Sequence, residues 1–246
     1  MITQLFTTFL YQPLLNLLVF IYNVIPGHDL GIAILILTAI IRLILYPLSA
    51  RSVKSQRALQ SLQPKLDKIK AKYKGEKEKQ SRAIMHFYKK NKINPLSSCL
   101  PLLIQFPVLI AIYRVLRDGI NNPESLNLLY SFVQNPGKLN ASLLGIINLG
   151  ERNVYLAVLA GAAQFWQSRM LLKSKKNKKG GQQGNMGNIA RNMSNQMIYV
   201  MPIFTVFIAM SFPAGLALYW FATTIFSIIQ QWFIFRKSKI KTTDDK

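Results

Sequence analysis

The chain has 246 residues, half of them hydrophobic, and its 31 Lys and Arg against 9 Asp and Glu give a formal net charge of +22. The hydrophobic residues occur in long blocks without charge, which excludes an ordinary soluble domain and indicates an integral membrane protein. The single Cys99 excludes an intramolecular disulfide framework, and no Lys or Arg precedes the first apolar block, so we expect no ordinary cleavable signal peptide.

Residues 1–25 are apolar and uncharged. Polar side chains recur every four residues, which places them on one face of a helix that Pro13 interrupts: Gln4, Thr8, Gln12 and Asn16. We favour an amphipathic helix at the outer membrane interface, and a further membrane span stays open as the alternative. Pro26, Gly27 and Asp29 predict a break before the next helix.

The first predicted span covers residues 30–49 and contains Arg42. Its length suffices for a hydrocarbon core of about 30 Å. A charge at this depth is costly and is usually kept only where it faces a polar cavity or a partner. Thr38 and Tyr46 lie four residues to either side and would form a polar stripe with Arg42. The stripe favours a hydrated groove, with snorkelling of Arg42 to the headgroups as the alternative.

Residues 51–92 are expected to form a cytoplasmic hairpin of two helices, with a solvated basic loop as the alternative. Two apolar stripes flank the turn Lys74-Gly75-Glu76, and they comprise Leu59, Leu62, Leu66, Ile69 and Tyr73, then Ala83, Ile84, Phe87 and Tyr88. Pro64 would kink the first helix or start a new one. The basic residues expected to recruit substrate or ribosome are Arg51, Lys54, Arg57, Lys65 and Lys68.

The second predicted span, residues 95–116, contains Pro101 and Pro107. Prolines are tolerated in membrane helices whose neighbours satisfy the freed carbonyls, so we expect a bent helix inside a bundle. Gln105 is its one amide at membrane depth. Two roles stay open for it, a hydrogen bond between helices or the lining of a cavity.

The remainder of the chain alternates between turn-rich or basic segments and apolar runs. In order, we predict an outer loop at 117–153, a third span at 154–172, a basic cytoplasmic loop at 173–195, a fourth span at 197–212, a fifth span at 214–235 and a basic cytoplasmic tail at 236–246. The third span carries Gly161, Ala162 and Ala163, small residues that allow close helix packing, followed by Gln164. A tight outer turn at Pro213 separates the last two spans.

Basic residues determine the expected topology. Residues 51–92 hold 14 Lys and Arg, residues 169–191 hold 7 and residues 236–246 hold 5, whereas residues 117–153 hold 3. By the positive-inside rule the first three segments are cytoplasmic. Five spans with the N-terminus outside and the C-terminus inside satisfy this rule for every segment.

The chemistry of a catalytic centre is missing from the sequence. There is no HExxH, GxSxG or Walker-type glycine loop, and His28 and His86 have no companions at ligand spacing, so we predict no enzyme, cofactor or metal site. None of the five apolar runs contains Asp or Glu, which cation-coupled transporters generally need. Arg42 therefore lacks an internal counter-ion, and a transient acidic ligand fits it better than a permanent salt bridge.

Five motifs follow one another along the chain: RLILYPLS, LQPKL, NPLSSCLPLLIQFPV, FPAGLALYWF and IIQQWFI. They resemble the YidC family of membrane insertases, with its Oxa-type and Albino-type relatives, over essentially the whole chain. The resemblance implies an all-α membrane protein with five transmembrane helices around a hydrophilic groove, an N-terminal interfacial helix and a cytoplasmic helical hairpin. The family's groove arginine falls on Arg42 and its threonine on Thr38. The residues expected in the substrate-binding groove are Arg42, Thr38, Gln105, Gln164, Tyr219 and Trp220.

The chain departs from the family pattern at several points. Trp220 stands where many members have a second tyrosine after Tyr219, which preserves an aromatic contact without a phenol. NPLSSC replaces the commoner NPLGGC. A large extracytoplasmic domain and a lipobox cysteine are both expected to be absent, which is typical of a minimal version of the family and favours a bacterial cytoplasmic (inner) membrane.

The resemblance implies a membrane protein insertase. A nascent membrane protein would enter the groove, Arg42 would attract its acidic outer tail, and its apolar segment would move sideways into lipid. The expected partners are nascent membrane proteins, the lipid bilayer, the ribosome, the signal recognition pathway and the Sec translocon, with no small-molecule substrate. Two alternatives stay open: a small-solute or anion transporter, although the spans show no inverted repeat, and a ribosome-anchoring membrane protein.

Overall fold

The computed structural model describes residues 2–91, 100–171 and 196–240. The expected start of the second span at 95–99, the basic loop at 173–195 and the end of the tail at 241–246 lie outside the described residues. In chain order the elements are α1 (Ile2–Phe6), the π-helical turn η1 (Thr7–Tyr11), α2 (Gln12–Val24), α3 (Leu30–Ile44), α4 (Tyr46–Lys72), α5 (Lys77–Lys90), α6 (Leu100–Asn121), the 3-10 helix η3 (Pro123–Leu128), β1 (Ser142–Leu143), β2 (Ile147–Asn148), α7 (Val154–Leu171), the π-helical turn η4 (Gln196–Val200), α9 (Met201–Ser211) and α10 (Ala214–Ile240).

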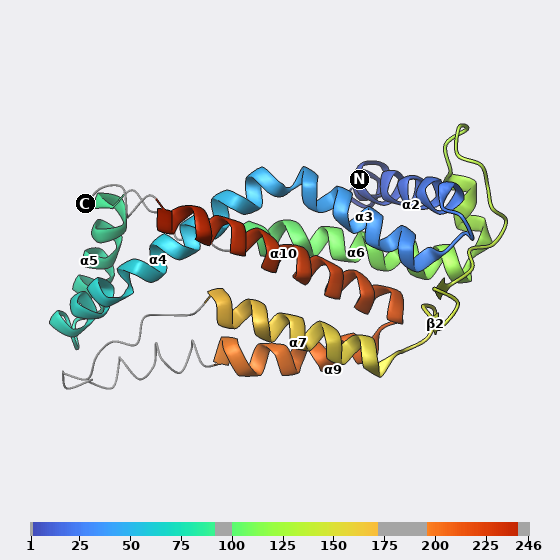
Figure 1. The fold of residues 1–246 in the computed structure, drawn as a ribbon. Coiled ribbons are helices and arrows are strands. Elements are labelled where there is room, and N and C mark those ends of the chain that lie inside the picture. Colours follow the sequence, from blue (N-terminus) through green and yellow to red (C-terminus); the bar gives the residue numbers. More distant parts are fainter. Residues whose placement is uncertain (1, 92–99, 172–195, 241–246) are drawn as a thin grey trace.

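The helices form an elongated bundle (Figure 1). Helix α10 packs against α3 and α7, and α7 packs against α9. Helices α4 and α5 extend from one end of the bundle, while the N-terminal helices and the connecting segment 122–153 lie at the other (Figure 1). The two short strands of that segment pair antiparallel, with Ser142 opposite Asn148. The described chain is therefore an all-helical body with one short strand pair in a loop.

The break predicted between the N-terminal helix and the first span is present. Helix α2 ends at Val24, and the turn that follows places Gly27 and His28 at φ values of 82° and 48°. Asp29 then caps α3, because its carboxylate accepts the backbone N–H of Ile32 at 2.8 Å. Such a cap satisfies a backbone donor that the first turn of a helix leaves free.

The predicted span at 30–49 is not one straight helix, which corrects the sequence-based expectation. Helix α3 ends at Ile44, α4 begins at Tyr46, and the two helix axes are bent by 68°. Pro47 explains the bend, since it has no N–H to bond the carbonyl four residues earlier and its ring clashes with that carbonyl. Arg42 consequently lies in the last turn of α3 and not in the middle of a longer helix.

Helices α4 and α5 form the hairpin that projects from the bundle. Gly75 provides a positive φ of 94° in the turn between them, and Gln80 of α5 donates to the carbonyl of Lys70 at 2.9 Å. Pro64 lies inside α4 without interrupting it, so it does not start a new helix. Helix α5 buries none of its side chains, whereas α4 buries Leu66. The hairpin is therefore held by few apolar contacts.

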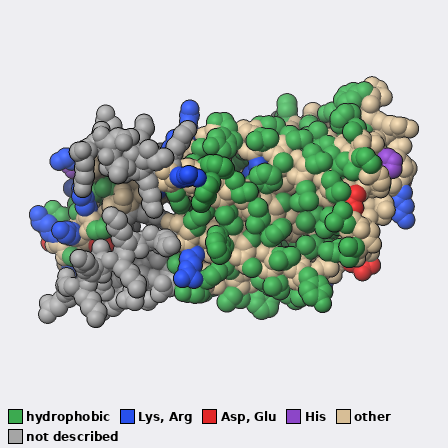
Figure 2. All heavy atoms as spheres, viewed as in Figure 1, with side chains coloured by type: hydrophobic (Ala, Val, Ile, Leu, Met, Phe, Trp, Pro, Cys, Tyr) green, Lys and Arg blue, Asp and Glu red, His purple; other side chains and the backbone are tan. Residues whose placement is uncertain are grey.

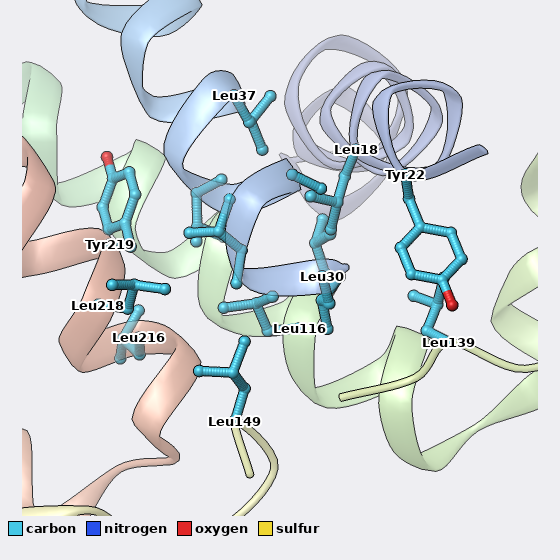
Figure 3. Packing of buried hydrophobic residues seen from close by; sticks show 14 of the residues in the cluster. Leu18, Tyr22, Leu30, Leu37, Leu116, Leu139, Leu149, Leu216, Leu218 and Tyr219 are labelled. Atoms are coloured by element: carbon cyan, nitrogen blue, oxygen red, sulfur yellow. The ribbon is translucent and has the colours of Figure 1, made fainter. Parts of the chain in front are cut away.

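The bundle core lies where α2, α3, α6 and α10 meet the connecting segment. Figure 3 shows Leu18 of α2, Leu30 and Leu37 of α3 and Leu116 of α6 in one cluster with leucines from α10 and the loop. Leu139 and Leu149 belong to the connecting segment and are almost fully buried. The segment is thus part of the core and fixes the ends of the helices that it covers.

The surface of the bundle is largely apolar. Hydrophobic side chains cover the middle of the face shown in Figure 2, and Lys and Arg concentrate toward the end that carries α4 and α5. By length and composition, Thr3–Val24 and Ala214–Arg236 could each cross a membrane, and the bent pair Leu30–Ile44 and Tyr46–Leu59 could form a third span. These features define a helical membrane protein. Whether residues 1–25 span or lie at the interface stays a prediction.

Candidate functional site

A hydrogen-bonded chain of three side chains links three helices inside the bundle. Arg42 of α3 donates from Nη2 to the Oε1 atom of Gln105 in α6 at 3.3 Å. The Nε2 atom of Gln105 donates to the hydroxyl of Tyr219 in α10 at 2.8 Å. Tyr219 is 1% exposed, and Figure 3 shows its hydroxyl pointing away from the leucine cluster. We call these three residues the Arg42 cluster.

Within the part of the chain that the structure describes, no carboxylate pairs with Arg42. The ion pairs found among these residues, such as Lys79 with Glu76, Arg82 with Glu78 and Arg117 with Asp118, do not involve Arg42. Arg42 lies near the C-terminal end of α3, whose free carbonyl groups carry only a partial negative charge. A guanidinium has five N–H donors, and in the described part of the chain one hydrogen bond is found for it. Arg42 therefore retains both charge and donors for a ligand.

Of the two roles that the sequence left open for Gln105, the structure shows one. It forms the hydrogen bonds between helices, and its orientation follows from chemistry, because arginine cannot accept a hydrogen bond and must face the amide oxygen. The amide nitrogen then faces Tyr219. Gln105 thus determines where the guanidinium of Arg42 lies relative to α10. Its lining of a cavity stays a prediction.

The polar stripe predicted on the first span does not form as expected. Thr38 is fully buried, and its hydroxyl donates to the carbonyl of Ile34 in its own helix at 2.6 Å. Tyr46 lies beyond the bend on α4 and is 47% exposed. Threonine in a helix commonly bonds the carbonyl four residues back, which uses the only proton of its hydroxyl. Gln105 and Tyr219, from two other helices, provide the partners of Arg42 instead.

Helix α10 presents a polar face that sequence reasoning missed. Tyr219, Thr223, Ser227 and Gln230 follow one another at spacings of four, four and three residues, which places them on one side of the helix. Ser227 bonds the carbonyl of Thr223, whereas the Oγ1 atom of Thr223 is buried without a partner in the described residues. The spacing could have revealed this face, because the helix is otherwise largely apolar.

The polar face of α10 ends at a contact with α4. The Gln230 amide bonds the hydroxyl of Ser49 at 2.7 Å and approaches the carbonyl of Tyr46 at 3.3 Å. One turn further along α10, the guanidinium of Arg57 lies 4.7 Å from the centre of the Phe235 ring and donates to the Phe235 carbonyl at 3.4 Å. We call this contact the α4–α10 clasp. It joins the base of the hairpin to the last helix.

The other predicted groove residues lie apart from the Arg42 cluster. Gln164 is half-buried in α7, and Trp220 is half-buried next to Tyr219 in α10. No hydrogen bond within the described residues connects either side chain to Arg42, Gln105 or Tyr219. Their part in a groove stays a prediction.

The predicted basic residues of the hairpin fall into two groups. Four have exposed side chains that a partner could reach: Arg51, Lys54, Lys65 and Lys68. Arg57 is half-buried and belongs to the α4–α10 clasp. Its position is structural, whatever further role it has in recruitment.

The fold and the Arg42 cluster define a helical membrane protein with a polar, cationic site between its helices. A protein-family model described as 60Kd inner membrane protein matches residues 20–242, and the chain belongs to this family. Together with the apolar helices, the family places the chain among membrane proteins of the bacterial inner membrane.

Relatives named membrane protein insertase YidC match almost the whole chain. The one from Fusobacterium nucleatum is 33% identical over 232 residues, which covers 94% of this chain and 98% of that protein. Those from Thioalkalivibrio sulfidiphilus and Geobacter sulfurreducens are 36% and 31% identical over 93% and 96% of this chain. The chain spans only 36% and 39% of the length of these two relatives.

Proposed function

We propose that this protein is a membrane protein insertase that receives nascent membrane proteins at the Arg42 cluster and releases their hydrophobic segments sideways into the bilayer. The observation that carries the proposal is the uncompensated charge of Arg42, held by Gln105 between α3, α6 and α10. The names of the relatives support an insertase over the alternatives of a small-solute transporter or a ribosome anchor.

Arg42 acts as the attractor for an acidic segment of the client. A carboxylate on the client's outer tail accepts charge-assisted hydrogen bonds from the free donors of the guanidinium, and these bonds are stronger than those between neutral groups. The attraction increases where the surroundings are less polarisable than bulk water. Because Gln105 is neutral, it positions Arg42 without competing for its charge.

The polar face of α10 provides the path from the α4–α10 clasp to the Arg42 cluster. Thr223 offers a buried hydroxyl without a partner in the described residues, and such a group gains from a water molecule or a client backbone. Polar parts of the client are then desolvated over a shorter distance. Its apolar segment gains about 25 cal/mol for each Å² that enters lipid.

The short helix α3 supports insertion through a thin region of the bilayer. Helix α3 has 15 residues, which correspond to about 22 Å of helix against a hydrocarbon core of about 30 Å. A short hydrophobic element is accommodated by thinning of the bilayer or by the flanking residues. We retain five spans around a hydrophilic groove, with the N-terminus outside and the C-terminus inside, as the architecture of the proposal.

The hairpin of α4 and α5 is the proposed point of arrival for clients. Its exposed Lys and Arg suit ribosomal RNA and anionic lipid, and α5 leaves all of its side chains at least partly exposed. We propose the ribosome, the signal recognition pathway and the Sec translocon as partners on this side.

The proposal is tested by the insertion of a short single-span client with an acidic outer tail into proteoliposomes. We expect Arg42→Ala to lose most of the insertion and Arg42→Lys to retain most of it. Arg152→Ala, an exposed arginine in the connecting segment, is the matched control and is expected to match wild type. Equal insertion by all four proteins would exclude Arg42 as the attractor, and no insertion by wild type would exclude an insertase that acts alone.

A further inference from the structure

A cavity of about 370 Å³ lies at the end of the bundle opposite the hairpin, between η1, the end of α6 and η3. Its lining includes charges of both signs and three hydroxyl groups, from Thr7, Tyr11, Arg114, Asp118, Glu124 and Ser125. Arg114 and Asp118 lie on α6 beyond Gln105, toward the end of that helix away from the Arg42 cluster, and the site plays no part in the proposed insertion. Its π-helical turn η1 is of a kind that is frequent at functional sites.

The charged groups of this cavity are not all paired within the protein. Asp118 is engaged on both oxygens, by Arg117 Nε at 2.8 Å and by the hydroxyl of Tyr11 at 3.4 Å. Arg114 lies with its guanidinium 5.3 Å from the centre of the Phe6 ring, and it has no ion pair among the described residues. Glu124 is exposed and likewise has none there. One cation and one anion thus remain available in the same cavity.

The three hydroxyl groups act as acceptors toward a ligand. Thr7 already donates to the carbonyl of Thr3, Tyr11 to Asp118 and Ser125 to the carbonyl of Asn122. A hydroxyl has one proton and two lone pairs, so each retains lone pairs that can accept from an ammonium group. A primary ammonium has three N–H donors, whereas a trimethylammonium has none. The cavity is therefore matched to a primary amine and not to choline.

The apolar surface of the cavity lining comes from Leu128 in η3. Leu5 and Phe9 are 52% and 73% exposed, but they lie two residues from Thr7 and Tyr11 and so point to the opposite side of the N-terminal helical segment from the cavity. Leu128, which lines the cavity, is 40% exposed. A polar cavity next to such a surface suits a molecule with a charged head and hydrocarbon chains.

We propose that this cavity binds the headgroup of a zwitterionic phospholipid with a primary amine, phosphatidylethanolamine. Arg114 holds the phosphate, because a guanidinium forms paired hydrogen bonds with phosphate oxygens. Glu124 and the hydroxyl lone pairs hold the ammonium. The acyl chains leave the cavity past Leu128. The lipid would thereby fix the N-terminal helix against the end of α6 at the outer side of the membrane.

Native mass spectrometry of the detergent-purified full chain with an equimolar mixture of phosphatidylethanolamine, phosphatidylcholine and phosphatidylglycerol tests the proposal. We expect wild type to retain phosphatidylethanolamine about fivefold more than either other lipid. Arg114→Gln should reduce retention of all three, and Glu124→Gln should abolish the preference for the amine. Arg152→Gln, outside the cavity, is the matched control and should behave as wild type.

Equal retention of the three lipids by wild type would overturn the proposal without any variant. Preference for phosphatidylethanolamine that persists in Glu124→Gln would also overturn the assignment. Soluble phosphoethanolamine serves as the test of the ligand's source, since it lacks acyl chains. If it displaces the lipid at equal concentration, the cavity is a site for a soluble zwitterion and the lipid assignment is wrong.

Discussion

The amide of Gln105 joins Arg42 to Tyr219, with its oxygen 3.3 Å from the guanidinium and its nitrogen 2.8 Å from the hydroxyl. Each of the three residues comes from a different helix, so one neutral side chain connects α3, α6 and α10. A neutral connector fixes a buried charge without cancelling it. An acid at the same position would fix the charge and cancel it.

Replacement of Gln105 therefore separates positioning from charge. We expect Gln105→Glu to form an ion pair with Arg42 and to reduce insertion of acidic-tailed clients at least as much as Arg42→Ala, while the thermal unfolding temperature is kept or raised. Gln167→Glu is the control, because it adds a carboxylate to α7 at a residue outside the predicted groove. Unchanged insertion by Gln105→Glu would show that the charge of Arg42 is not used.

Thr223 tests the polar face of α10. Its buried hydroxyl lacks a partner in the described residues, so Thr223→Val is expected to leave the free energy of unfolding unchanged or to raise it by up to about 1 kcal/mol. The same change should slow insertion, because it removes a polar group from the proposed path. The neighbouring control is Thr224→Val. The hydroxyl of Thr224 already donates to the Trp220 carbonyl at 2.9 Å. Faster insertion in Thr223→Val would contradict a hydrated path.

The α4–α10 clasp is expected to hold the base of the hairpin. Arg57→Ala removes both the contact with the Phe235 ring and the hydrogen bond to its carbonyl, whereas Lys54→Ala removes an exposed charge from the same helix. Spin labels on α5 and on α7 should report a broader distance distribution in Arg57→Ala and an unchanged one in Lys54→Ala. Identical distributions in both variants would show that the clasp does not restrain the hairpin.

Gly31 tests the packing of the connecting segment on α3. A methyl group at this position would lie closer to the side chain of Leu143 than van der Waals contact allows, and 3.0 Å from the Leu143 Cα atom. We expect Gly31→Ala to cost about 1 to 3 kcal/mol of stability, seen as a lower unfolding temperature in detergent. In Gly150→Ala the nearest atom would be 3.4 Å away, so this control should change stability by less than about 0.5 kcal/mol. Equal unfolding temperatures would contradict the close approach of β1 to α3.

The charge pattern and apolar runs of the sequence predict a helical membrane protein, and the family assignment agrees. The sequence also shows Arg42 as an unusual charge inside an apolar run. The partners of Arg42 could be predicted only in part. Gln105 and Tyr219 were candidates, but the fold that brings α6 and α10 together is not visible in local spacing. Thr38 lies one turn from Arg42 in α3, but a helical periodicity does not show that its hydroxyl donates to its own backbone, and its part in a groove stays a prediction.

The polar line of the N-terminal helix has a second explanation that its spacing could not provide. Asn16 is 3% exposed and binds the connecting segment, donating to the Leu128 carbonyl at 3.2 Å and accepting the N–H of Tyr130 at 2.6 Å. Gln12 donates to the same carbonyl at 3.1 Å. Buried backbone groups of a loop need partners, and these amides provide them. A polar face on a helix can thus bind protein as well as water or headgroups.

A charge exchange between protein and client tests the central claim most directly. Insertion into proteoliposomes is measured for wild type and Arg42→Glu, each with a client whose outer tail carries Asp and Glu and with one whose tail carries Lys at the same positions; equal amounts of folded protein are verified first. The account predicts that wild type favours the acidic tail and that Arg42→Glu favours the basic tail. The same preference in both proteins would show that residue 42 does not select the client by charge, and would contradict the account.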